Sequence, residues 1–192
     1  MARSAWPRSR LNATPSVGTL TGPFKVPDAI TDTGPPLHLH EIDRLSALRS
    51  FEQLRMPPLV VKELSGFGLV PARLFPETDP RIVVTPPENN SWQELLQDGG
   101  PRIQPADAQV LVLARQVRFQ LPVLTDDLSL RRRVEGEGGT AVGSLGILLR
   151  SFRDQALSRE ELEDAVERLM TGSTLHLSAA FRAYVRGLLR DL

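Results

Sequence analysis

Short apolar runs separated by longer amphipathic stretches dominate the chain from residue 26 onward, and they predict alternating strands and helices. Four such runs are rich in apolar side chains and end at polar or turn-forming residues. They predict strands at 26–31, 81–85, 121–125 and 140–142. Strands that alternate with helices indicate an α/β fold with a parallel sheet covered by helices on both faces.

The stretches between these runs carry apolar residues at the spacing of a helix face. The spacing of Leu37, Ile42, Leu45, Leu48 and Phe51 predicts one amphipathic helix. A second helix is expected from Pro57-Pro58, because proline is tolerated in the first turn. Further helices are expected at 92–96, 105–117, around the three arginines after Asp127, and at 145–155, 158–170 and 178–192. Ser158 and Glu161 form a capping box that marks the start of one of them.

Composition limits the classes of protein to which the chain can belong. Of its 192 residues, 41% are hydrophobic and 24% are charged, as in ordinary soluble globular proteins. Its formal net charge is zero, so no bulk positive field indicates a nucleic-acid binder. The absence of cysteine excludes disulfides, thiolate metal sites and cysteine nucleophiles, and is consistent with a cytoplasmic location. No segment has the roughly 18 uninterrupted apolar residues of a membrane helix, so no membrane contact is expected.

The organisation along the chain predicts one domain with extensions at both ends. Residues 1–25 are rich in Pro, Ser, Thr, Gly and Arg and predict a disordered extension. Residues 26–150 hold the alternating strands and helices, and residues 151–192 are expected to form helices that pack on this domain.

Acidic residues stand at positions where a parallel sheet would gather them. Asp32 and the pair Asp126-Asp127 each follow a predicted strand, and Glu63 and Asp107 are expected in the first turns of apolar helices. The carboxyl ends of parallel strands form a common ligand crevice. Each pair of carboxylates about 4 Å apart there costs on the order of 4 kcal/mol, unless a proton or a cation offsets the repulsion. Mg²⁺ or Mn²⁺ would suit such a site and would support phosphate-ester chemistry.

Each acid also has a structural interpretation. The helix dipole favours an acidic residue in a first helical turn, and aspartate is common in turns that follow strands. The positions alone therefore leave structural and catalytic roles open.

Five motifs in order resemble PIN domains. Ile30-Thr31-Asp32-Thr33-Gly34-Pro35 resembles the opening of these domains, and Pro57 to Leu64 resembles their P-x-x-V-x-x-E-L motif. The remaining three resemble segments of one prokaryotic subfamily, and they are Ala106 to Ala114, Val123 to Leu128, and Val142 to Leu148. The resemblance runs from about Ala29 to Leu149, with weaker likeness in the last helices.

The resemblance implies a sheet of order 3-2-1-4-5 with a flanking helical extension, and a metal-dependent ribonuclease site. This site would comprise Asp32, Glu63, Asp107 and Asp127, with Asp126 as a further or alternative metal ligand. Thr33 and Thr125 would orient ligands or a water molecule. The family members of this kind are often VapC-like toxins held by an antitoxin, and relatives commonly form homodimers.

Two departures from the subfamily bear on activity. Asp107 stands where glutamate is usual, which shortens the reach to a metal ion, and Gln109 replaces a second glutamate, which removes a negative charge. A catalytically degenerate domain that binds RNA or protein is therefore the alternative function.

Basic residues and histidines complete the candidates. Arg131 and Arg132 could contact RNA phosphates beside the acidic residues, although a solvated helix face is an equal alternative. His38 and His40 lie two residues apart, so on a helix they diverge and are poorly placed to chelate one zinc ion.

Overall fold

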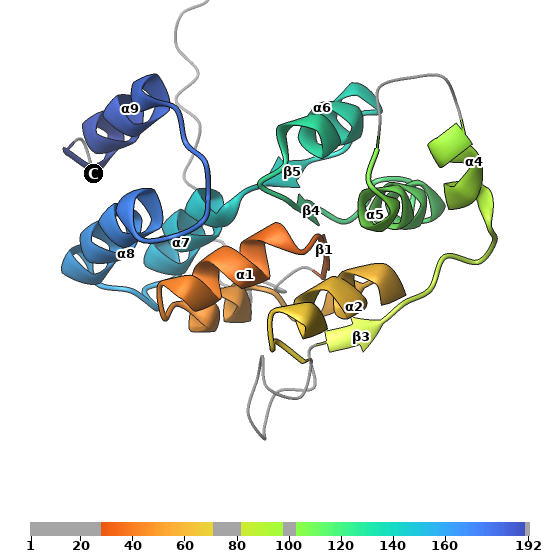
Figure 1. Cartoon of the computed structure of the whole chain (residues 1–192). Helices are drawn as coiled ribbons and strands as arrows, with labels where there is room; N and C mark the ends of the chain where they lie inside the picture. The colour runs from red at the N-terminus through yellow and green to blue at the C-terminus, as the bar shows by residue number, and fades with distance from the viewer. Residues whose placement is uncertain (1–27, 71–81, 98–102, 191–192) are drawn as a thin grey trace, which may run out of the picture.

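The computed structural model describes residues 28–70, 82–97 and 103–190, which form a five-stranded parallel sheet with helices on both sides (Figure 1). The strand order is β3-β2-β1-β4-β5, which confirms the expected α/β class and the order 3-2-1-4-5. The strands are short, and they are β1 (Ala29–Thr31), β2 (Leu54–Met56), β3 (Ile82–Val84), β4 (Val123–Leu124) and β5 (Ala141–Val142). The expected extension at residues 1–25 lies outside the described residues.

The central strand β1 pairs in parallel with β2 on one side and with β4 on the other. Ile30 pairs with Arg55 of β2 on one side and with Val123 of β4 on the other. All three residues of β1 are fully buried, because a central parallel strand is covered on both faces. The next pair, Thr31 with Leu124, is the last before both strands end, so β1 and β4 release their following residues at the same edge.

Nine helical segments surround the sheet in the part of the chain that the structure describes. Their bounds are α1 (Gly34–Glu41), the 3₁₀ helix η1 (Leu45–Ser50), α2 (Pro58–Gly66), α4 (Ser91–Gln97), α5 (Pro105–Gln116), α6 (Leu128–Gly136), α7 (Ser144–Arg153), α8 (Arg159–Thr171) and α9 (Ala179–Arg190). Proline occupies the first turn of α1, α2 and α5. The missing N–H of proline costs nothing there, because the first turn of a helix has no internal acceptor for it.

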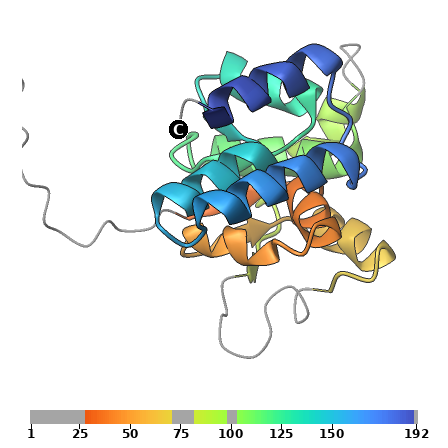
Figure 2. The same ribbon diagram turned by 90° about the vertical axis from the view of Figure 1, so that its left-hand side faces the viewer.

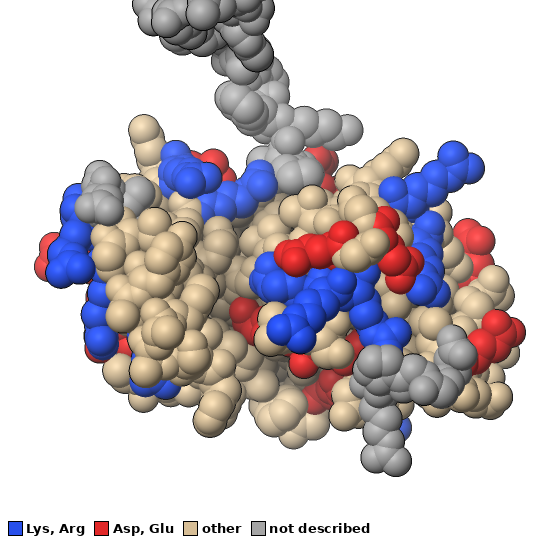
Figure 3. Space-filling view, turned by 90° about the horizontal axis from the view of Figure 1, so that it is seen from above, with Lys and Arg blue, Asp and Glu red and all other residues tan. Residues whose placement is uncertain are grey.

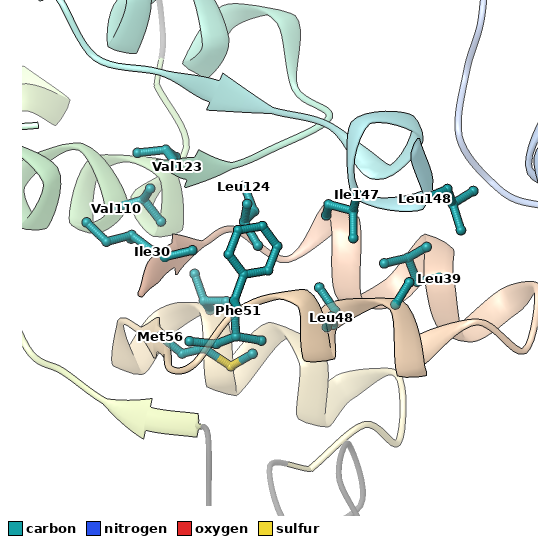
Figure 4. Close-up of a cluster of buried hydrophobic side chains, with 14 of the residues drawn as sticks. Ile30, Leu39, Leu48, Phe51, Met56, Val110, Val123, Leu124, Ile147 and Leu148 are labelled. Carbon is teal, nitrogen blue, oxygen red and sulfur yellow. The ribbon is translucent and has the colours of Figure 1, made fainter. Parts of the chain in front are cut away.

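The sequence prediction was wrong in two places before residue 57. The single helix expected from Leu37 to Phe51 is instead two segments, α1 and η1, because Asp43 between them adopts a left-handed backbone with φ 55°. The apolar spacing continues through the break, since Leu39 and Leu48 both pack into the same core (Figure 4). The apolar runs also gave no sign of β2, because the charged Arg55 lies between its two apolar residues.

The core lies between the sheet and the helices on its flanks. Figure 4 shows Ile30 and Leu124 from the sheet beside Phe51 and Ile147, with Val110 of α5 close to Ile30. Phe51 is 1% exposed, and the Arg150 guanidinium lies 5.0 Å from the centroid of its ring. Elements far apart in sequence therefore share one core.

The C-terminal helices are tied to the rest of the fold. α8 packs on α7 (Figure 2). The capping box predicted from Ser158 and Glu161 is confirmed at the start of α8. Glu41, at the end of α1, accepts hydrogen bonds from the backbone N–H and hydroxyl of Thr174, both at 2.8 Å. A division of the chain at residue 150 falls inside α7.

None of the helices among the described residues combines the length and the apolar content that a membrane crossing requires.

Candidate active site

The site lies where β1 and β4 end side by side. Asp32 follows β1 directly, and Asp126 and Asp127 follow β4 after one intervening residue. The backbone N–H of Asp32 donates to the carbonyl of Leu124 at 2.9 Å, so the two strand ends are held in contact. The expectation that strand-end acids meet at one edge is therefore confirmed.

Asp32 is the buried centre of the site, with 6% of its surface exposed. Its Oδ1 accepts a hydrogen bond from the backbone N–H of Thr33, and its Oδ2 accepts one from the Thr125 hydroxyl at 3.0 Å. Burial raises the pKa of Asp32 to about 6; these two hydrogen bonds oppose the rise, and the charges of Glu63 and Asp127 add to it. The carboxyl is thus oriented by the protein and lies within reach of two other acids.

Glu63 reaches the site from α2. It lies in the second turn of that helix rather than the first, because α2 begins at Pro58. Its Oε2 accepts a hydrogen bond of 2.6 Å from the Thr33 hydroxyl, while Glu63 itself remains exposed. Thr33 therefore contacts Asp32 through its backbone and Glu63 through its side chain.

Asp107 lies in the first turn of α5, as expected. Its pKa is raised to about 7, first by burial and then by the charges of Asp32, Asp127 and Glu63, while a hydrogen bond from the Gln104 backbone opposes the shift. Like charges act on a pKa over distances of a few ångströms. Asp107 on α5 therefore lies within the range of charges that come from three other elements of the fold.

Thr125 links the two strand-end acids. Its hydroxyl donates to Asp32 and accepts a hydrogen bond from the backbone N–H of Asp127 at 3.1 Å. The Asp127 Oδ1 caps α6 by accepting from the backbone N–H of Leu130 at 2.6 Å. Asp127 is exposed, and its second carboxylate oxygen is not engaged by this cap.

Asp126 has a different environment from its neighbour. Its Oδ1 accepts from the backbone N–H of Ser144 at 2.8 Å, and its Oδ2 accepts from the Ser144 hydroxyl and lies 2.8 Å from His38 Nδ1. Asp126 is absent from the charges that raise the pKa values of Asp32 and Asp107. The geometry therefore favours Asp127 as the fourth acid of the candidate metal site. Asp126 instead joins the end of β4 to α1 and to the start of α7 through its hydrogen bonds.

The chemistry of the four acids matches a hard divalent cation, because carboxylate oxygens are the protein ligands that Mg²⁺ and Mn²⁺ prefer. As they stand, no three His, Asp or Glu side chains among the described residues are grouped closely enough to hold one metal ion. Glu63 is bonded to Thr33 and Asp127 caps α6, so both would have to turn toward a shared ion. The same finding applies to the zinc alternative at His38 and His40.

The two candidate arginines of α6 differ in their contacts. Arg131 donates to the carbonyl oxygens of Ala141 at 2.8 Å and Thr125 at 3.1 Å, so much of its guanidinium is engaged within the fold. Arg132 is exposed. In Figure 3, basic and acidic side chains lie interspersed on the upper face, where Figure 1 places α6. No continuous basic surface is visible on this face.

Comparison with protein families places the described part of the chain in a known family. A family model described as a PIN domain matches residues 28–190, which is most of the chain. Neither the curated proteins nor the solved structures contain a match to this chain.

Proposed function

Because this chain belongs to the PIN domain family, whose members are generally nucleases, we propose that it is a metal-dependent ribonuclease. Its site would be formed by Asp32, Glu63, Asp107 and Asp127. The observation that carries the proposal is the position of Asp32 and Asp127 at the ends of neighbouring strands, with Glu63 joined to the same edge through the Thr33 hydroxyl. The charges of these three acids also raise the pKa of Asp107. A protein has little reason to gather four acids at one edge of a sheet unless a cation is to offset their repulsion.

The four carboxylates would bind Mg²⁺ or Mn²⁺ at the edge where β1 and β4 end. Bound there, the ion would polarise a phosphoryl oxygen and lower the pKa of a coordinated water molecule, which supports hydrolysis of a phosphodiester. Asp32 is already oriented for this task by the Thr33 backbone and the Thr125 hydroxyl. Glu63 and Asp127 are exposed, so they can turn toward an ion and a substrate without rearrangement of the core.

The basic side chain best placed to meet a phosphate backbone is that of Arg132. It lies on α6, which begins one residue after Asp127, and it is exposed. Phosphate contacts of this kind position a strand without reading its sequence. The engaged guanidinium of Arg131 would contribute less to RNA binding, because it is bonded to two carbonyl groups.

The experiment uses the purified full-length chain with RNAs of varied sequence, in EDTA, Mg²⁺ or Mn²⁺. We expect cleavage that needs metal and is lost in Asp32→Asn and Asp127→Asn, while both variants remain folded by circular dichroism. Asp164→Asn is the matched control, because Asp164 lies on α8 and pairs with Arg44 at the surface. Intact RNA under all conditions, with the variants indistinguishable from the unmodified chain, would end the proposal.

One observation favours a second candidate, a degenerate domain that binds RNA or protein without cleavage. The carboxylates of the described residues are not grouped as a ready metal site. Calorimetric titration with Mn²⁺ separates the two functions, because a degenerate site should bind the ion negligibly while RNA or a partner still binds.

A toxin role, with an antitoxin partner, a homodimer and a cytoplasmic location, extends the same proposal. Expression of the chain in a bacterial host should then slow growth. Asp127→Asn should relieve this effect, as should coexpression of the protein encoded beside this gene.

A further inference from the structure

Gln109 makes a contact that its position in the sequence did not suggest. It lies on α5, two residues after Asp107, and only 6% of its surface is exposed. Its side-chain carbonyl oxygen, Oε1, accepts a hydrogen bond of 3.0 Å from the backbone N–H of Leu59. Leu59 is the second residue of α2, the helix that carries Glu63.

The start of α2 needs an acceptor from outside the helix. Pro57 is its N-cap and provides no side-chain hydrogen bond, and Pro58 is its first residue. The N–H of Val61 is satisfied by the Pro57 carbonyl at 3.2 Å, but the N–H of Leu59 has no acceptor within the helix. Gln109 supplies that acceptor from α5, in place of the N-cap side chain that normally precedes a helix.

This hydrogen bond joins the two helices that carry acids of the site. Leu59 and Glu63 are four residues apart and therefore lie on the same face of α2. On α5, Asp107 and Gln109 are two residues apart, so their side chains diverge. Gln109 can thus hold α2 while Asp107 faces the other acids. α2 and α5 pack against each other, and the charge of Glu63 contributes to the raised pKa of Asp107.

We propose that Gln109 is a positioning residue that sets the separation of Glu63 and Asp107 by holding the start of α2 against α5. The inference deepens the proposed metal site and rests on it for its functional consequence. The contact also explains how glutamine can stand at position 109, where the resembling subfamily has glutamate. A glutamate would offer the same acceptor to Leu59, so the substitution by glutamine keeps the contact and removes only a charge.

The geometric part is tested without any metal ion. The chain contains no cysteine, so Ser65→Cys on α2 and Arg115→Cys on α5, both exposed, provide unique sites for spin labels. Double electron–electron resonance then reports the distance distribution between the two helices. We expect a shifted or broadened distribution in Gln109→Met, which lacks the acceptor, and an unchanged one in Gln109→Glu. Gln109→Asn, which is too short to reach Leu59, should behave as Gln109→Met and serves if the latter fails to fold.

The matched control is Gln116→Met on the same helix. The side-chain amide nitrogen of Gln116 is buried without a hydrogen-bond partner, so its replacement should leave the distribution unchanged. A distribution in Gln109→Met and Gln109→Asn that equals that of the unmodified chain would refute the inference.

The functional part is tested by Mn²⁺ titration of the same variants in a calorimeter. We expect Gln109→Met to weaken Mn²⁺ binding at least tenfold, with Gln109→Glu and Gln116→Met within threefold of the unmodified chain. Undiminished binding in a folded Gln109→Met would reduce Gln109 to a structural cap and would overturn its role in the site. Absence of Mn²⁺ binding by the unmodified chain would instead overturn the proposed metal site, while the spin-label distances still decide the geometric part.

Discussion

The Thr125 hydroxyl donates a hydrogen bond to Asp32 Oδ2 at 3.0 Å, from the end of β4 to the end of the neighbouring strand β1. The Thr125 hydroxyl oxygen also accepts a hydrogen bond from the backbone N–H of Asp127. One hydroxyl therefore orients one candidate ligand directly and holds the backbone of another. Hydroxyls in this arrangement stabilise the ligands rather than bind the ion themselves.

We predict that Thr125→Val weakens Mn²⁺ binding and RNA cleavage about 10- to 100-fold, the usual effect of losing a group that orients a ligand. Valine has nearly the shape of threonine but cannot donate to Asp32 or accept from Asp127. The N–H of Asp127 would lose its partner, at a cost of about 1–3 kcal/mol in unfolding free energy. Calorimetry and urea denaturation measure the two effects.

Thr171→Val is the control for this change. Its hydroxyl is exposed and bonds only to the Glu167 carbonyl within α8. It should leave both Mn²⁺ binding and cleavage unchanged. Equal activity of the Thr125→Val and Thr171→Val variants would contradict the role of Thr125.

The raised pKa values of Asp32 and Asp107 make the stability of the metal-free protein depend on pH. Their pKa values in the folded protein, about 6 and about 7, lie above the ordinary aspartate value of 3.8 that applies to the unfolded chain. Between these limits the folded protein binds more protons than the unfolded chain, so the unfolding free energy falls as pH rises. We expect stability in EDTA to decline from about pH 4 and to level off above about pH 7.

Asp107→Asn should remove most of this decline between pH 6 and 7, because that interval belongs mainly to Asp107. Urea denaturation at pH 5, 6, 7 and 8 measures the slope. Asp164→Asn, at an exposed ion pair, should give a curve parallel to that of the unmodified chain. Identical slopes for the unmodified chain and Asp107→Asn would show that the pKa of Asp107 is not raised.

Much of the sheet could be predicted from the sequence because most of its strands lie in apolar runs, whether buried as in β1 and β4 or partly exposed as in the edge strand β3. The strands predicted around Ile30, Val83 and Val123 are present, each shorter than expected. β2 could not be found in the same way, because Arg55 separates its two apolar residues, Leu54 and Met56, and no apolar run is present. The break between α1 and η1 depends on the backbone of Asp43, which the spacing of apolar residues does not record.

The site was predictable in its location but not in its details. The end of a strand places Asp126 and Asp127 at the same edge, and the spacing after Thr125 favours Asp127 as a ligand only slightly. The direction of each side chain depends on later elements: Ser144 at the start of α7 engages Asp126, and the first turn of α6 engages Asp127. The contact of Gln109 with Leu59 could not be predicted from the sequence either, because the two residues are 50 positions apart and lie on different helices.

The different partners of Asp126 and Asp127 predict opposite effects of the same substitution. Asp126→Asn weakens charge-assisted bonds to Ser144 and removes the charge beside His38, so we expect a loss of about 1–3 kcal/mol in unfolding free energy. Asp127→Asn should leave stability nearly unchanged, because asparagine caps a helix as well as aspartate does. It should nevertheless abolish metal-dependent cleavage. Denaturation and cleavage assays on both variants would contradict this assignment if Asp126→Asn were the folded, inactive one.

Gly143 occupies a position where the fold has no room for a side chain. A Cβ there would lie 2.7 Å from Asp126 Oδ1 and 3.2 Å from Arg131 Nη2. Asp126 cannot withdraw without giving up its bond to the N–H of Ser144, so Gly143→Ala should lower the unfolding free energy by about 1–3 kcal/mol, the usual penalty of overpacking.

In contrast, a Cβ on Gly187 in α9 meets nothing within 4 Å, so Gly187→Ala should stabilise the protein by roughly 0.5–1 kcal/mol through helix propensity. Urea denaturation of the two variants should therefore move the midpoint in opposite directions, and a Gly143→Ala variant as stable as the unmodified chain would show that Asp126 is free to move.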